Sequence, residues 1–179
     1  GEGSLMGAII GMAQNYVGSN NINLLYPKGQ FGTRIQGGKD HASPRYIYTY
    51  INSITKILFP EQDKPLLTYL EDDGMSIEPE FYAPILPTVL INGCTGIATG
   101  WSTTVPSYNP IDIGKLMECK LTNKEYPQIT PYYHGFKGTI QKVKEGQYIT
   151  KGRYERVNAS TIVITELPIG TWTEKYMEF

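Results

Sequence analysis

The pattern of apolar residues changes between the two halves of this 179-residue chain, and this change constrains the fold most. Up to about residue 105 apolar residues recur at helical spacing, whereas from about residue 136 short β-rich runs alternate with turns. We therefore expect an α+β protein divided near residues 106–111. No apolar run approaches the roughly 18 residues that a membrane helix needs, so no spanning helix is expected.

Two helices are predicted in the first half. Residues 4–17 have helical spacing and precede Gly18, which suits a left-handed stop. Residues 43–59 form the second, because Ser43 is a favoured N-cap residue and Pro44 suits the first helical position. Four apolar residues form its expected stripe: Ile47, Ile51, Ile54 and Leu58.

The other predicted elements are short. A glycine-rich loop fills residues 18–44, between the two helices. The remaining predictions are a short helix and an Asp73-Gly74 turn within 61–80, a strand at 85–91, a helix near 111–121, and strands at 139–143, 147–150 and 161–165. The chain has neither an initiator methionine nor a tail at its end, so we expect it to be a piece of a longer protein.

Charge is uneven along the chain, although the formal net charge is only −1. Residues 26–60 hold five basic residues and one acid, residues 61–80 hold seven acids and one lysine, and residues 81–111 hold no charge. A local basic surface, rather than the total charge, is what meets phosphate groups. The charge pattern is therefore compatible with DNA as a binding partner.

The two cysteines, Cys94 and Cys119, suit neither a disulfide framework nor a metal cluster. With only two histidines in the chain, a zinc site is not expected either. A reducing compartment follows from this cysteine usage.

Arg45 and Tyr46 fall in the first turn of the helix predicted to begin at Ser43. Free backbone N–H groups and the positive end of the helix dipole make such a turn a site for phosphate. A phenol is a poor nucleophile at neutral pH, but a neighbouring arginine favours its phenolate. The pattern indicates a tyrosine at a phosphate site, and the alternative is an ordinary exposed tyrosine in a chain that has 14.

Longer motifs extend across the whole chain in one order. They are 13–25 (AQNYVGSNNINLL), 29–34 (GQFGTR), 37–40 (GGKD), 43–46 (SPRY), 78–82 (EPEFY), 91–93 (ING), 96–102 (GIATGWS), 136–140 (FKGTI), 166–168 (ELP) and 171–173 (TWT). With these motifs the chain resembles the breakage–reunion region of the type IIA DNA topoisomerases, specifically the eukaryotic-type topoisomerase II, over essentially all positions.

The resemblance implies a winged-helix domain at residues 1–105, followed by the start of a tower domain at 106–179. In this family the tyrosine matching Tyr46 attacks a DNA phosphodiester and becomes joined to the 5′ end of the break. Arg45 would stabilise charge on the scissile phosphate. Two subunits of a homodimer each cut one strand of double-stranded DNA, a second duplex passes through, and the break is resealed.

The resemblance also assigns DNA contacts. Ile97 matches a side chain that wedges between base pairs and bends the duplex, as apolar wedges do. Lys28, Arg34 and Lys39 lie on the matching DNA-facing loop, where the local positive charge suits phosphate. The alternatives are an Ile97 packed in a small sheet and basic residues that are simply solvated.

Two cofactors are implied for the full enzyme, Mg²⁺ and ATP, both bound outside this segment. The metal-binding acids of the family lie in a preceding Toprim domain, and no matching motif occurs here. The acidic run Glu71-Asp72-Asp73 is better interpreted as a solvated turn. No residue here is expected to hold a metal or cofactor.

Two departures from the family pattern are visible. His41 stands where alanine is commoner, and we interpret it as a surface histidine rather than a proton relay. Cys94-Thr95 replaces an Ala-Glu pair, which we interpret as drift. His134, in the second half of the chain, is interpreted as structural. The departures raise the alternative of a divergent copy from a large DNA virus, so the expected location is the nucleus or a cytoplasmic viral replication site.

Two other function classes remain open. The first is a non-catalytic winged-helix module that binds and bends DNA without cutting it, and the intact Arg45-Tyr46 pair speaks against it. The second is a scaffold for dimer assembly, which predicts no salt-dependent affinity for DNA.

Overall fold

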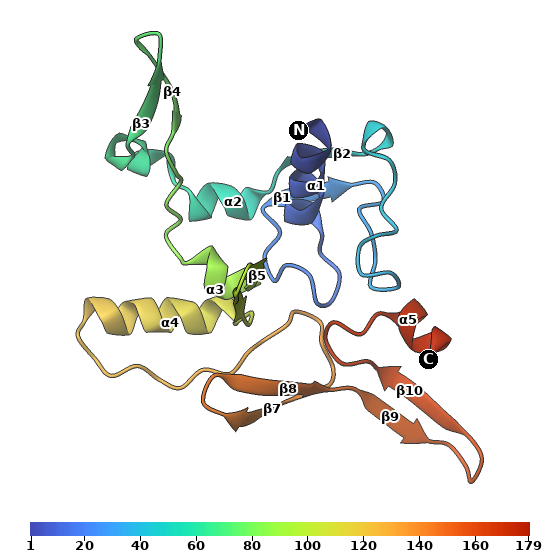
Figure 1. Ribbon diagram of the computed structural model, residues 1–179. Helices are drawn as coiled ribbons and strands as arrows, with labels where there is room; N and C mark the ends of the chain where they lie inside the picture. Colours follow the sequence, from blue (N-terminus) through green and yellow to red (C-terminus); the bar gives the residue numbers. More distant parts are fainter.

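The computed structural model describes residues 1–179, with helices and five separate two-stranded antiparallel sheets (Figure 1). None of the helices combines the length and the apolar character that crossing a membrane requires. The helices are α1 (Glu2–Ala13), α2 (Ser53–Leu58), α3 (Thr88–Asn92), α4 (Pro110–Leu121) and α5 (Thr173–Glu178), with 3₁₀ turns at Pro44–Tyr46 and Glu61–Leu66. The strand pairs are β1 (Leu25–Lys28) with β2 (Tyr48–Ile51), β3 (Tyr69–Asp72) with β4 (Met75–Pro79), β5 (Cys94–Ala98) with β6 (Trp101–Val105), β7 (Thr139–Lys144) with β8 (Gln147–Lys151), and β9 (Arg153–Arg156) with β10 (Ile162–Glu166).

The main hydrophobic cluster lies where α1 meets the start of the glycine-rich loop. Ile10, Ala13 and Phe31 are buried in it, and Leu25 and Ile47 pack against them. Figure 1 shows α1 lying against β1, with the strand pairs β7–β8 and β9–β10 along the opposite side of the molecule. The cluster therefore anchors both ends of the loop that leads from β1 to β2.

Asn21 joins the two parts of the chain. The two N–H groups of its side-chain amide are shared among the carbonyl oxygens of Ile91 at 2.9 Å, Tyr108 at 3.1 Å and Tyr132 at 2.9 Å. Its side-chain oxygen accepts a hydrogen bond from the backbone N–H of His134 at 2.8 Å. One side chain thus fixes α3, the start of α4 and the segment that precedes β7.

The first predicted helix is confirmed, but it ends earlier than expected. α1 stops at Ala13, and the side-chain amide of Asn20 donates to the carbonyl oxygens of Gly11 at 2.7 Å and Gln14 at 2.8 Å. These bonds satisfy carbonyl groups that the last helical turn leaves free. Gly18 does adopt a positive φ of 93°, but it lies beyond the helix end.

The helix predicted at 43–59 is wrong. The segment forms the 3₁₀ turn Pro44–Tyr46, strand β2 and the short helix α2. Its tyrosine, isoleucine and threonine residues favour strands, and β2 pairs with β1 in the register Tyr26↔Tyr50. Ser43 does occupy the N-cap position, followed by Pro44, but its side chain makes no capping hydrogen bond and only a 3₁₀ turn begins there.

The strand predicted at 85–91 is also wrong, because residues 88–92 form helix α3 and bury Ile91 completely. Short apolar runs do not distinguish strand from helix by periodicity alone. In the acidic stretch, the predicted short helix is the 3₁₀ turn Glu61–Leu66, and the predicted turn lies at Asp73-Gly74, both with positive φ. The flanking strands β3 and β4 were not predicted.

The second half follows the prediction closely. The helix near 111–121 is α4, and Asn109 caps it by accepting a hydrogen bond from the Ile111 N–H at 2.9 Å. The three predicted strands are β7, β8 and β10, with Gly146 at a positive φ of 71° in the first turn. Strand β9, which pairs with β10, was not predicted.

Candidate active site

Tyr46 closes the 3₁₀ turn that follows the glycine-rich loop. Pro44 sits at the first position of this turn, and the Tyr46 N–H donates to the Ser43 carbonyl at 2.9 Å. The Tyr46 side chain is 72% exposed, so its hydroxyl group is open to an incoming ligand. The guanidinium carbon of Arg45 lies 5.8 Å from the centre of the Tyr46 ring, within the range of a cation–π interaction.

The helix expected to begin at Ser43, with Arg45 and Tyr46 in its first turn, is absent, and the electrostatic argument for Tyr46 changes with it. A turn of three residues has too few aligned peptide groups to develop the dipole of a long helix. The positive charge beside the phenol is that of Arg45, which is itself exposed. Within this chain, the Arg45 guanidinium group is therefore the main group that can stabilise a negative charge next to Tyr46.

We call residues 29–40 the glycine loop. A Cβ added at Gly32 would lie 2.6 Å from the Gly38 Cα, so the two glycines let the backbone approach itself closely. Asp40 accepts hydrogen bonds from the Thr33 N–H, at 2.8 Å, and from the Thr33 hydroxyl. The hydroxyl bond is the main cause that holds the pKa of Asp40 below its ordinary value.

The three basic residues expected to meet DNA lie in different environments. Lys28 and Lys39 are exposed, and Lys28 lies opposite Tyr48 in the β1–β2 pair. Arg34 is turned inward, since its Nη1 lies 2.5 Å from Oε1 of Glu166 and its Nη2 donates to the Leu167 carbonyl at 2.7 Å. This arrangement favours an internal role for Arg34 over the expected phosphate contact.

His41 is exposed beside the glycine loop, and its Nδ1 lies 2.8 Å from the neighbouring Ala42 carbonyl oxygen. This contact is local, and His41 is also close enough to Asp40 to be a minor cause of the lowered pKa of that carboxyl group. The second histidine, His134, lies at the joint made by Asn21, with its Nδ1 3.2 Å from the Tyr132 hydroxyl. The exposure of His41 agrees with its interpretation as a surface histidine, and the contacts of His134 agree with a structural residue.

The structure has a strip of exposed tyrosines next to Tyr46, which was not predicted from the sequence. Tyr48 and Tyr50 alternate along β2 and therefore share one face, on which Tyr50 stacks against Tyr26 with ring centres 4.7 Å apart. The alternation Tyr46-Tyr48-Tyr50 was the available signal, but the stretch was interpreted as a helix.

The hairpin formed by β5 and β6 projects two large apolar side chains into solvent. Ile97 is 87% exposed and pairs with Ser102, whereas Trp101 is 83% exposed and pairs with Ala98. Because side chains alternate along strands, Ile97 and Trp101 lie on opposite faces of the hairpin. The hairpin bears no charge, and the exposure of Ile97 disagrees with the alternative of a residue packed in a small sheet.

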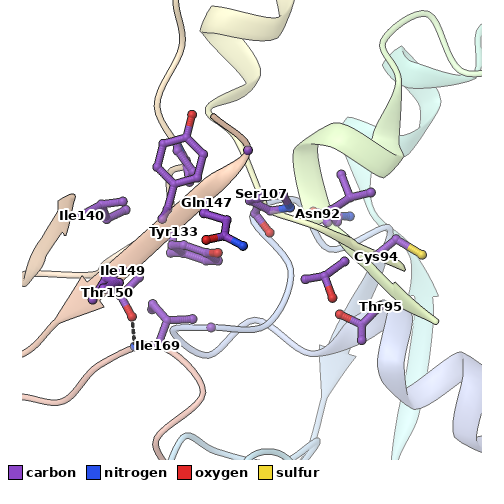
Figure 2. Close-up of a pocket in the computed structure, with 18 of the residues that line it drawn as sticks. Asn92, Cys94, Thr95, Ser107, Tyr133, Ile140, Gln147, Ile149, Thr150 and Ile169 are labelled. Atoms are coloured by element: carbon purple, nitrogen blue, oxygen red, sulfur yellow. Dashed lines mark hydrogen bonds between the residues drawn. The ribbon is translucent and has the colours of Figure 1, made fainter. Parts of the chain in front are cut away.

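A cleft of about 720 Å³ opens between the base of this hairpin and strands β7 and β8 (Figure 2). Cys94 and Thr95 line one side and Gln147 and Thr150 line the other, where the Thr150 hydroxyl accepts a hydrogen bond from the Ile169 N–H at 3.2 Å. Neither Arg45 nor Tyr46 lines the cleft, so it is separate from the candidate active site.

No group of three or more histidine, cysteine, aspartate or glutamate side chains lies close enough together to hold a metal ion. The acids of the 71–73 run belong to the β3–β4 hairpin, and Asp73 lies in its turn. The residues present therefore do not fit a magnesium site on their own.

The family model that describes the A-type subunit of DNA gyrase/topoisomerase IV matches residues 1–179. The chain belongs to this family.

Within the family, the chain is similar to the eukaryotic enzymes. It is 56% identical to DNA topoisomerase 2 of Arabidopsis thaliana over 183 residues, and 50% identical to DNA topoisomerase 2-alpha of Gallus gallus over 178 residues. These matches cover 100% and 99% of this chain but only 12% of each relative. The resemblance inferred from the motifs is confirmed.

A solved structure gives the same result for the fold. The crystal structure of the Plasmodium falciparum topoisomerase II DNA-binding, cleavage and re-ligation domain matches with a TM-score of 0.95 and 46% identity. The match covers 100% of this chain and 24% of that one. The α+β class expected from the sequence is thereby confirmed, with its strands paired antiparallel.

Proposed function

We propose that this chain is the part of a type IIA DNA topoisomerase that cuts and reseals one strand of a duplex through Tyr46. The observation that carries the proposal is the exposed Tyr46 hydroxyl beside the Arg45 guanidinium, in a chain of this family. We assign residues 1–105 to a winged-helix cleavage domain and residues 106–179 to the start of a tower domain.

The proposed chemistry is a transesterification. The Tyr46 oxygen attacks the phosphorus atom, a bond from tyrosine to the 5′-phosphate forms, and the bond from phosphorus to the 3′-oxygen breaks. The phenolic proton is lost from the nucleophile and the leaving oxygen ends as a 3′-hydroxyl group. Because one phosphate ester replaces another, resealing is the reverse step and consumes no energy source. Arg45 stabilises the charge that grows on the phosphate oxygens.

The whole enzyme is proposed to act as a homodimer on double-stranded DNA, with ATP driving strand passage and Mg²⁺ assisting cleavage. We propose that both groups are bound by parts of the enzyme outside this segment. We propose a nuclear location, or a cytoplasmic viral replication site for a virus-encoded copy.

Lys28 and Lys39 are the proposed phosphate contacts, because both are exposed on the part of the chain that precedes Tyr46. Arg34 is not among them, since Glu166 holds its guanidinium group. Each lysine contact should release condensed counterions when DNA binds. Replacing either lysine by alanine is therefore expected to reduce the slope of log K for DNA binding against log salt concentration by about one unit.

Ile97→Ala is expected to reduce DNA bending and to shift the choice of cleavage sites, while covalent chemistry at Tyr46 continues. The isoleucine is 87% exposed on an uncharged hairpin, where it can enter and unstack a base step. Fluorescence energy transfer between the ends of a short duplex measures the bend. Ile111→Ala, which removes another exposed isoleucine from α4, is the matched control. Equal bending by the two variants would contradict the assignment of Ile97.

The polarity of the covalent link tests the proposed function. The full-length enzyme is incubated with supercoiled DNA and Mg²⁺ and quenched with detergent, and the trapped DNA is then digested with exonucleases. We expect the protein to block digestion from 5′ ends and to leave 3′ ends sensitive. Absence of a covalent link, with DNA binding intact, would favour the non-catalytic bending module. Absence of any salt-dependent DNA affinity would favour the scaffold.

A further inference from the structure

The end of the chain returns to the glycine loop and packs on it. Figure 1 shows the segment between β10 and α5 beside the loop that follows β1. A Cβ added at Gly37 would overlap Nε1 of Trp172, so the indole occupies space that only a glycine leaves free. The indole also meets the ring of Tyr16 edge-on, with centres 5.7 Å apart.

A second contact between the same segments is ionic. The buried carboxylate of Glu166 pairs with Arg34 of the glycine loop at 2.5 Å and accepts hydrogen bonds from the backbone N–H groups of Lys137 and Leu167, each at 2.9 Å. The Glu174 N–H donates to the Ile35 carbonyl at 3.1 Å. Separating Arg34 from Glu166 would leave the buried carboxylate without its counter-charge, which is energetically costly. The ion pair therefore holds the glycine loop against residues 166–167.

The opposite side of the glycine loop is held by the end of α1. The side-chain amide of Gln14 donates to the carbonyl oxygens of Phe31 at 2.9 Å and Gly38 at 3.1 Å. The loop leads directly into the turn that carries Tyr46, and the next residue, Ile47, packs against the buried cluster around Phe31. The position of Tyr46 therefore depends on a loop that is fixed between α1 and residues 166–174.

We propose that Trp172 and Glu166 are positioning residues for Tyr46. They hold the glycine loop in the one conformation from which the Arg45–Tyr46 turn reaches the scissile phosphate. This inference rests on the proposed role of Tyr46 as the nucleophile. Attack requires the reacting atoms to be in line and close together, and a misplacement of about 1 Å costs roughly 100-fold in rate.

The test uses the full-length enzyme and the variant Trp172→Ala. We expect the single-turnover rate of covalent complex formation at saturating DNA to fall by roughly 100-fold. The dissociation constant for DNA is expected to change much less than the rate, because Lys28, one of the two proposed phosphate contacts, lies on β1 outside the glycine loop. Trp172→Phe keeps an aromatic ring against Tyr16 and Gly37 and should recover most of the rate.

A pair of glycine variants provides a matched control. Gly37 and Gly74 both have positive φ, 64° and 77°, so alanine is strained at either position. Only at Gly37 does the added methyl group collide with Trp172, since the space around Gly74, in the turn between β3 and β4, is open. Gly37→Ala should reproduce the rate loss of Trp172→Ala, and Gly74→Ala should cleave at close to the wild-type rate.

Two results would overturn the inference. One is wild-type cleavage by Trp172→Ala. The other is a rate loss that Trp172→Phe does not rescue and that follows an equal loss of DNA affinity and of thermal stability, which indicates a structural role alone. Failure of the nucleophile assignment is distinguishable from both, because the wild-type enzyme itself would then form no adduct on Tyr46.

Discussion

Tyr46→Phe is expected to abolish DNA cleavage by the full-length enzyme, with a loss of roughly 10⁴-fold or more, as for other enzymes that lose their nucleophile. The substitution removes one oxygen atom from a side chain that is 72% exposed. Folding and DNA binding should therefore change little, with affinity within about threefold of wild type. Trapping of covalent complexes measures the cleavage, and fluorescence anisotropy measures the binding.

Tyr48→Phe is the matched control for this variant. Tyr48 is 69% exposed, lies two residues further along the chain and loses the same oxygen atom. We expect it to cleave at close to the wild-type rate. If both variants lose cleavage, the effect belongs to the tyrosine strip as a surface rather than to one nucleophile.

Arg45→Ala is expected to lower the cleavage rate by about 10² to 10³, the usual cost of removing one group that stabilises transition-state charge. The guanidinium lies 5.8 Å from the Tyr46 ring and is the only charge that the turn itself supplies. Arg45→Lys keeps the charge but loses the planar pair of donors, so an intermediate rate is expected. Single-turnover cleavage at saturating DNA measures each rate.

Lys39→Ala is the comparison variant for Arg45→Ala. Lys39 is an exposed residue of the glycine loop with a proposed role in phosphate contact only. It should weaken DNA binding and leave the rate at saturation unchanged. A rate loss from Arg45→Ala that disappears at saturating DNA would show that Arg45 acts in binding and not in catalysis.

The sequence predicted the second half of the fold well because the signals there are local. Asn109 followed by Pro110 marks the start of α4, and the turn at Glu145-Gly146 separates two β-rich runs that pair with each other. Such contacts need no information from distant parts of the chain. Strand β9 was missed because its sequence, Arg153–Arg156, is polar on both faces and gives no alternation of apolar residues.

The segment around Tyr46 shows where local signals fail. The intervals between Ile47, Ile51 and Ile54 match a helix, yet the pairing of Tyr50 with Tyr26 decides the structure. That pairing joins residues 24 positions apart and depends on the buried cluster that closes the glycine loop. The motif located the candidate nucleophile, but the electrostatic argument attached to it assumed a helix that is not there.

Arg34 shows the same limit for charged residues. Its place in a basic, glycine-rich stretch suggested a DNA contact, and nothing in the sequence links it to Glu166, 132 positions later. Charge patterning reports which residues can meet phosphate, but only the fold shows which of them are already paired.

Mapping the covalent adduct tests the central claim most directly. The full-length enzyme is incubated with supercoiled DNA and Mg²⁺, quenched with detergent and digested, and the peptide that carries the nucleotide is sequenced by mass spectrometry. We expect a single adduct on the Tyr46 hydroxyl, absent in Tyr46→Phe and present in Tyr48→Phe. An adduct on another residue, or none while DNA is bound, would contradict the proposal that Tyr46 cuts DNA.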